Sequence, residues 1–149
     1  MGSHGDMRPL FPSFTLAAIL AGSQGIGGTC GPDNADDIPY LEDLKADFLN
    51  ADYAEFAKRA GPYFPDLAEN ARDYFGQVMV VFPSPFPACA TILQRREDPG
   101  FYQDLVFYFP AGSSAPVALL LIAARAEDKV HLIEFTFDTS ISDVLEDIK

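Results

Sequence analysis

The chain has few basic side chains. Its 149 residues include 10 Lys and Arg against 22 Asp and Glu, and the formal net charge is −12 at pH 7. A chain this acidic repels the phosphate backbone of DNA and RNA, so nucleic acid is excluded as an expected partner. The acidic excess either serves solubility or attracts a basic partner.

Histidine and cysteine are scarce as well. The only histidines are His4 and His131, and the only cysteines are Cys30 and Cys89. Metal sites gather three or four such side chains, so we expect no metal site and no other cofactor. Two cysteines are too few for a disulfide framework. In an oxidising compartment they could pair, which would stabilise the fold by about 4 kcal/mol through loss of chain entropy in the unfolded state. Otherwise Cys89 is a buried thiol and Cys30 a mobile one.

No hydrophobic run is long enough to span a bilayer. The apolar stretch Leu10–Ala21 has about twelve residues, whereas a membrane-spanning helix needs about twenty. Arg8 precedes this stretch, and the small residues Gly22 and Ser23 follow it. The order of basic, apolar and small residues is typical of a secretory signal peptide. The alternative is that Leu10–Ala21 is an N-terminal helix of the fold.

The predicted signal peptide sets the domain organisation. We expect a signal peptide and flexible segment over residues 1–30, a single domain over residues 31–149, and a periplasmic or secreted location. Ser23 stands where a bacterial lipoprotein would carry its lipidated Cys. Membrane contact is therefore expected only in transit, or if Ser23 replaces such a Cys. Residues 1–6 resemble a vector remnant, since Met7 is followed by a more natural beginning.

Helical periodicity precedes strand periodicity along the chain. Apolar residues recur every three or four positions over Leu41–Leu49, Tyr53–Ala60 and Pro65–Gly76. Asp52 has an acid three residues later, which is the capping-box spacing. A short C-terminal helix is expected after Ser140. The predicted strands are Val78–Phe82, Ala88–Arg96, Phe101–Phe109, Pro116–Arg125 and Val130–Asp138.

These elements predict an α+β fold. In it, N-terminal helices pack on a curved antiparallel β-meander of four to five strands, and the short C-terminal helix docks on the sheet. Alternation gives the last three strands two faces. The face expected to carry the helices is apolar apart from Gln103 and His131. Its members are Phe101, Gln103, Leu105, Phe107, Phe109, Ala118, Leu120, Ile122, Ala124, His131, Ile133, Phe135 and Phe137.

The opposite face, which we call the mixed face, combines acids and tyrosines with Leu and Val. Its members are Tyr102, Asp104, Val106, Tyr108, Val117, Leu119, Leu121, Ala123, Arg125, Val130, Leu132, Glu134, Thr136 and Asp138. A solvated sheet face normally alternates more cleanly between apolar and polar residues. We therefore expect the N-terminal segment, a second subunit or a ligand to cover the mixed face.

The candidate site lies on the mixed face. Turns at Gly112 and Asp128 would place Asp104, Leu121 and Glu134 in one cross-strand row, with the carboxylates about 10 Å apart. If the face were enclosed, these acids could act as general acid and base; if it is open, they are solvated surface acids. The candidate ligand contacts are Tyr102, Tyr108, Leu119, Leu121 and Leu132.

Helices followed by a curved meander resemble the cystatin-like and NTF2-like α+β domains. The stretch Leu49-Asn-Ala-Asp-Tyr-Ala-Glu-Phe56 is similar to the helix hairpin that opens many NTF2-like domains. The likeness is architectural and spans Asp37 to Lys149, but the strand pair usual between the second and third helices is missing. It transfers no catalytic residue, because such folds host enzymes, ligand carriers and interaction modules alike.

Three functions remain open. The first is a non-enzymatic exported bacterial module that binds a small apolar ligand or a protein partner, with a homodimer through the mixed face as one form. The second is an NTF2-like enzyme of the isomerase or hydrolase type that uses Asp104 or Glu134. The third is a cytoplasmic acidic binding protein of the immunity or chaperone kind, which requires Leu10–Ala21 to be structural.

Overall fold

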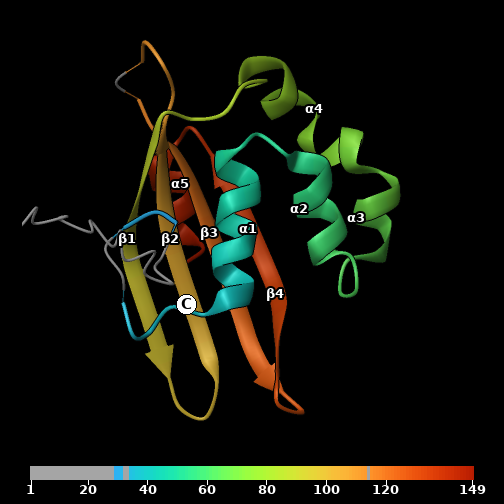
Figure 1. The fold of residues 1–149 in the computed structure, drawn as a ribbon, viewed down its shortest axis with the longest axis vertical. Coiled ribbons are helices and arrows are strands. Elements are labelled where there is room, and N and C mark those ends of the chain that lie inside the picture. The colour runs from blue at the N-terminus through green and yellow to red at the C-terminus, as the bar shows by residue number, and fades with distance from the viewer. Residues whose placement is uncertain (1–28, 32–33, 114) are drawn as a thin grey trace, which may run out of the picture.

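The computed structural model describes residues 29–31, 34–113 and 115–149 (Figure 1). The predicted signal peptide therefore lies outside the described residues. Four helices come first: α1 (Pro39–Leu49), α2 (Tyr53–Ala60), α3 (Pro65–Glu69) and α4 (Ala71–Val81). Four strands and a helix follow: β1 (Ala88–Glu97), β2 (Phe101–Phe109), β3 (Val117–Ala126), β4 (Lys129–Asp138) and α5 (Ile141–Glu146). The predicted α+β class, antiparallel meander and C-terminal helix are confirmed.

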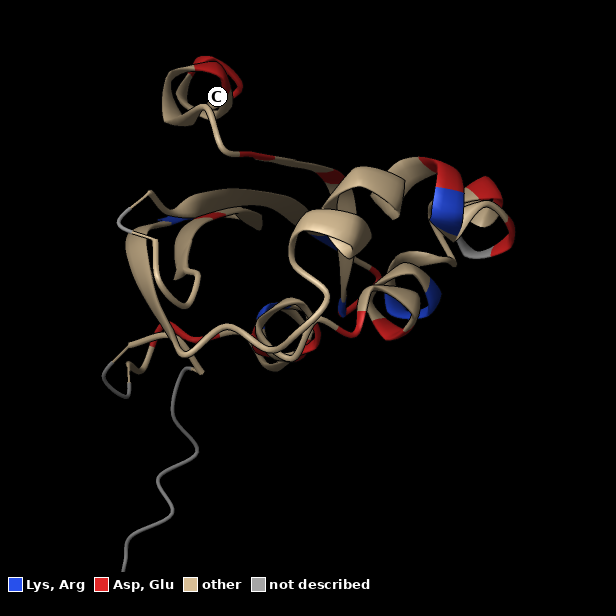
Figure 2. Ribbon diagram, turned by 90° about the horizontal axis from the view of Figure 1, so that it is seen from above, with Lys and Arg blue, Asp and Glu red and all other residues tan. Residues whose placement is uncertain are grey.

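The sheet follows the order of the chain. Its strands lie in the order β1-β2-β3-β4 and all neighbours are antiparallel, so β1 and β4 are the two edges. Glu127 and Asp128, with φ of 51° and 62°, form the two-residue turn between β3 and β4. Two such positive φ angles match the right-handed twist of a hairpin. The sheet is curved when it is seen from above (Figure 2).

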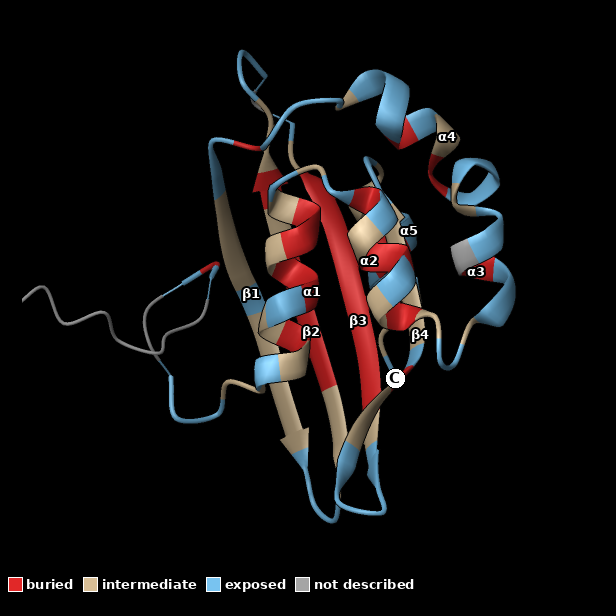
Figure 3. Cartoon of the chain, turned by 45° about the vertical axis from the view of Figure 1, so that its right-hand side comes forward, coloured by how far each residue is buried: buried red, intermediate tan, exposed pale blue. Residues whose placement is uncertain are grey.

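Helices cover both faces of the sheet. Helices α1 and α2 lie across one face, α3 and α4 extend past β4, and α5 packs on the opposite face (Figures 1 and 3). Helix α2 begins as predicted, because the Asp52 side chain accepts a hydrogen bond from the Glu55 N–H at 3.2 Å.

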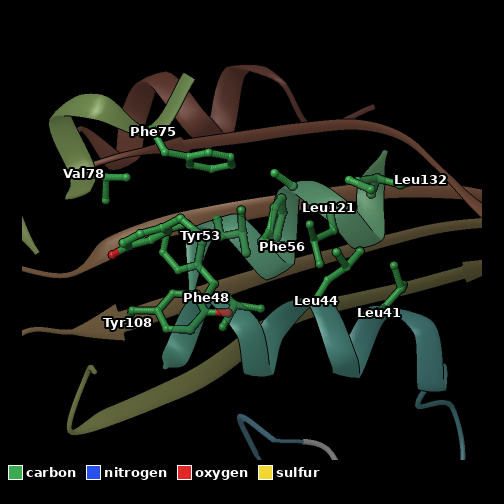
Figure 4. Packing of buried hydrophobic residues seen from close by; sticks show 14 of the residues in the cluster. Leu41, Leu44, Phe48, Tyr53, Phe56, Phe75, Val78, Tyr108, Leu121 and Leu132 are labelled. Carbon is green, nitrogen blue, oxygen red and sulfur yellow. The ribbon is translucent and has the colours of Figure 1, made fainter. Parts of the chain in front are cut away.

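Two apolar clusters form the core. The larger one lies between the sheet and helices α1, α2 and α4, with Phe48 and Phe56 at its centre (Figure 4). Phe48 contacts the rings of Tyr53, Phe56, Phe86, Tyr108 and Phe137 at centroid distances of 4.8–6.1 Å. The smaller cluster joins Leu105, Ala118, Leu120 and Ile122 to Val144 of α5.

The predicted strand Val78–Phe82 is wrong. Residues 71–81 form α4, and the predicted helix Pro65–Gly76 is divided at Asn70. Phe75 and Val78, three residues apart, are both buried in the larger cluster. Burial of one helical face thus overrides the strand preference of the β-branched residues.

The predicted roles of the two sheet faces are also wrong. Helices α1 and α2 cover the mixed face, and the face expected to carry them packs on α5 instead. In addition, β4 has a bulge: Ala123 pairs with Leu132 whereas Ile122 pairs with Glu134, so Ile133 is an extra residue. A bulge reverses the alternation beyond it. Phe135 and Phe137 therefore join the side of Leu132 and the helices.

Candidate functional site

A cluster of charged side chains is buried between α1 and the sheet. Asp104 of β2 and Lys45 of α1 are both 0% exposed, and Lys45 Nζ lies 2.7 Å from Asp104 Oδ2. Arg96 of β1 donates from Nη1 to Asp104 Oδ1 at 2.6 Å, and Lys45 Nζ donates to Glu42 Oε1 at 2.6 Å. We call these four residues the charge cluster; their two positive and two negative charges balance.

Hydrogen bonds anchor the charge cluster to the surrounding structure. The hydroxyl of Tyr108 donates to the Lys45 carbonyl at 3.0 Å, and Arg96 Nε donates to the Asp36 carbonyl at 2.8 Å. Burial, with the nearby acids Glu42 and Asp104, holds the pKa of Tyr108 well above its usual value, so its hydroxyl stays neutral. A balanced and enclosed cluster of this kind ties α1 to β1 and β2.

The structure does not bring Asp104 and Glu134 together. Asp104 pairs with Leu121, but Leu121 pairs with Phe135, and Glu134 lies opposite Ile122 on the other face. The predicted row of two acids is therefore wrong, because the sequence pattern does not reveal the bulge. Asp104 is engaged by two cations, and Glu134 lies at the β4 edge.

The other predicted contacts on the mixed face are covered by the protein's own helices. Tyr108, Leu119, Leu121 and Leu132 are all buried in the larger cluster, which leaves them no surface for a ligand or a second subunit. Tyr102 is half-buried, and its hydroxyl accepts a hydrogen bond from Arg125 Nε at 3.0 Å. We expected the N-terminal segment, a second subunit or a ligand to cover the mixed face; helices α1 and α2 cover it instead.

A disulfide tethers residues 29–31 to the β1 edge. Cys30 is bonded to Cys89 of β1, and the Thr91 N–H donates to the Cys30 carbonyl at 2.6 Å. The Thr29 N–H donates to Glu42 Oε2 at 2.9 Å, which links the same segment to α1. These residues therefore cover part of the outer edge of β1.

A cleft lies between α3 and β4. It has a volume of about 580 Å³ and an aromatic lining with two carboxylates. We call it the aromatic cleft; its lining residues are Tyr63, Phe64, Pro65, Asp66, Leu67, Tyr74, Glu134, Phe135, Thr136 and Phe137. Tyr63 and Tyr74 are 43% and 56% exposed, so they offer aromatic surface to the solvent.

Aromatic packing gives the cleft a fixed floor. Phe135 contacts Phe64 edge-to-face at 5.6 Å and Phe75 in a stacked geometry at 6.1 Å. Phe137 stacks on Phe75 at 5.3 Å. Such ring contacts stabilise beyond the area that they bury. The floor therefore belongs to the core, whereas Tyr63 and Tyr74 stand at its rim.

Histidine 131 lies near this rim rather than in a catalytic arrangement. Its ring meets Tyr63 edge-to-face at 4.4 Å, and its Nε2 lies 3.1 Å from the Ala126 carbonyl oxygen. The aromatic cleft was not predicted from the sequence. One signal was available: the turn that contains Tyr63 and Phe64 places two aromatic residues between prolines, outside any apolar stripe.

Comparisons with known proteins add no relative: the chain matches no protein-family model, no curated protein and no solved structure. Over the part of the chain that the structure describes, no helix is long and apolar enough to cross a membrane. Within the same part, no group of three or more His, Cys, Asp or Glu side chains is placed to hold a metal ion.

Proposed function

We propose that this chain is a non-enzymatic exported binding module that holds an apolar group of its ligand in the aromatic cleft. The observation that carries the proposal is the cleft itself, about 580 Å³ in volume and lined by aromatic side chains from the turn before α3, from α4 and from β4. Ligand sites commonly have volumes of 300–1,000 Å³ and mainly apolar walls with a few polar groups. Asp66 and Glu134 are the charged groups in this lining.

The geometry of the acids favours binding over catalysis. General acid–base work needs a carboxylate that can reach a substrate. Asp104 is fully buried and held by Lys45 and Arg96. Glu134 borders the aromatic cleft without a second acid in its cross-strand row.

The disulfide supports export. Disulfides persist in the periplasm and outside the cell, and they are rare in the cytosol. The Cys30–Cys89 bond joins the segment before α1 to the edge strand β1. The signal peptide predicted before Cys30 supports the same location. We also propose that the fold is related to the cystatin-like and NTF2-like domains, whose architecture it resembles.

Titration with Nile red tests the proposal, since this dye is apolar and neutral and its binding does not depend on the net charge. We expect saturable binding with a rise in fluorescence. Tyr74→Ser should weaken the dye affinity about tenfold, because it removes an aromatic wall of the cleft. Ile92→Ser on β1 is the matched control: Ile92 is 53% exposed, close to the 56% of Tyr74, but lies on the other edge strand. Unsaturable binding, or equal weakening by both variants, would contradict the proposal.

A further inference from the structure

The two edges of the sheet differ. The outer edge of β1 meets residues 29–31, whose Cys30 carbonyl accepts the Thr91 N–H and whose position is held by the disulfide. The outer edge of β4 has no such segment among the described residues: beyond Leu132 no hydrogen bond to its backbone is made from outside the sheet. An uncovered edge strand presents unpaired N–H and C=O groups to any extended chain that approaches it.

The hairpin turn indicates which groups of β4 face outward. In a two-residue hairpin the residues that flank the turn form a hydrogen-bonded pair, and bonded and non-bonded pairs then alternate. Counted from the pair Ala126–Lys129, Leu132 directs its N–H away from β3.

Beyond the bulge the same alternation exposes the backbone beside the aromatic cleft. Glu134 resumes the pairing opposite Ile122, and Phe135 and Phe137 follow opposite Leu121 and Leu119. Phe135 and Phe137 are then the residues whose N–H and C=O groups point away from β3. Both residues line the aromatic cleft, so free backbone groups and apolar surface lie side by side.

We propose that residues 134–138 of β4 bind an extended peptide as a fifth strand of the sheet, with alternate side chains of the peptide in the aromatic cleft. This inference rests on the proposed function and names its ligand class. Strand addition takes its affinity from main-chain hydrogen bonds and its specificity from pockets for every second side chain. The paired length is limited to the regular stretch after Ile133, because the bulge interrupts the ladder.

The charge of the site selects a basic peptide over a second copy of this chain. Asp66 and Glu134 line the cleft, Asp138 ends the strand, and the lining contains no Lys or Arg. Two copies paired through β4 would bring these acids together, on chains that each carry a formal charge of −12. A peptide that alternates Lys with an apolar residue instead matches both the acidic rim and the aromatic floor.

Calorimetric titration with a short capped peptide of alternating Lys and Val tests the proposal. We expect saturable binding with a Kd below about 1 mM. Two further peptides carry N-methyl groups on either the Val or the Lys amides. Only one set of amides can face β4, so one methylated peptide should lose at least tenfold in affinity and the other less than about twofold. Equal effects of the two methylations, or no saturable binding, would overturn the proposal.

Two measurements locate the bound peptide. Amide exchange of Phe135 and Phe137 should slow at least tenfold in the complex, whereas slowing confined to α4 would overturn strand addition. Glu134→Gln should weaken the affinity for the peptide a few-fold. Glu55→Gln, on helix α2 away from the cleft, should leave the affinity unchanged. Protection of the same two amides in a concentration-dependent dimer of the free protein would show a second copy at this edge and also overturn the peptide proposal.

The outcomes separate this inference from the broader function. If Tyr74→Ser weakens the Nile red affinity as expected but the Lys–Val peptide does not bind, the aromatic cleft is a binding site and strand addition is wrong. If neither binds, the proposed function fails too.

Discussion

Lys45 and Asp104 offer the sharpest test of how α1 is held on the sheet. Both side chains are 0% exposed and lie 2.7 Å apart. Lys45→Met removes the cation but keeps a long apolar side chain, and it leaves Asp104 with Arg96 as its remaining partner. Breaking a buried ion pair on one side costs about 3–5 kcal/mol, because the other charge stays in a medium of low dielectric constant. We therefore expect Lys45→Met to lower the free energy of unfolding by that amount.

A double-mutant cycle isolates the pair. Asp104→Leu alone should cost a similar amount, since it leaves Lys45 with Glu42 as its remaining acid and Arg96 with no carboxylate. The double variant should cost less than the sum of the two single variants by on the order of 2–3 kcal/mol, because neither charge is then left unpaired. Part of the cost should remain, since Arg96 loses its carboxylate in both variants that lack Asp104.

Urea unfolding followed by circular dichroism measures these changes without adding ions. The slope of the free energy of unfolding against urea concentration should stay constant, while the urea concentration at the midpoint of unfolding falls. Lys58→Met is the matched control: Lys58 pairs with Glu55 at 3.7 Å, and its side chain is 80% exposed. An exposed pair contributes little, so this variant should change the free energy of unfolding by less than about 0.5 kcal/mol. Additive effects of Lys45→Met and Asp104→Leu within about 0.5 kcal/mol would refute the assignment of a coupled pair.

Three further changes test other parts of the fold by the same urea assay. Replacing Cys30 and Cys89 by Ser should cost about 4 kcal/mol, because the sequence separation of 59 closes a long loop; a cost below about 1 kcal/mol would contradict this. Burial raises the pKa of Tyr53 from 10.0 to about 12. The stability that the neutral hydroxyl contributes to the fold is therefore fully present below pH 10 and is lost as the pH rises toward 12. Tyr53→Phe should therefore reduce the alkaline loss of stability by about 2 kcal/mol, and an unchanged pH profile would refute that cause. Gly100→Ala should cost about 1–3 kcal/mol, since its Cβ would lie 2.7 Å from the Cβ of Arg125; a neutral effect would show that the turn can shift.

The order of elements was predictable because local patterns determine it. The strands at 88, 101, 117 and 129 follow runs of β-branched and aromatic residues bounded by turns, and the Asp52 cap has its expected spacing. Residues 78–82 were misassigned since a short apolar run fits a strand and a helix equally well. Only the burial of Phe75 and Val78 on one helical face decides between them.

The face of the sheet that carries the helices could not be predicted from alternation. An acid such as Asp104 on a strand predicts a face exposed to solvent. Lys45, about sixty residues earlier in the chain, instead neutralises Asp104 inside the core. A pairing between an acid on one element and a cation on another has no local pattern in the sequence. The mixed face was therefore expected to be covered by the N-terminal segment, a second subunit or a ligand, although α1 carries the complementary charge.

The bulge at Ile133 connects the core to the aromatic cleft. Without the extra residue, strict alternation would turn Phe135 and Phe137 toward α5, and Glu134 and Thr136 would face the helices. The cleft would then have an acid and a hydroxyl as its floor, and α4 would lose the ring contacts of Phe75. The inserted residue therefore places Phe135 and Phe137 against Phe75 of α4 and in the lining of the cleft. It leaves the backbone of these two residues at an edge that receives no backbone hydrogen bond from outside the sheet. Since a bulge is a feature of backbone pairing rather than of side-chain type, the sequence pattern does not show it, and the candidate site depends on it.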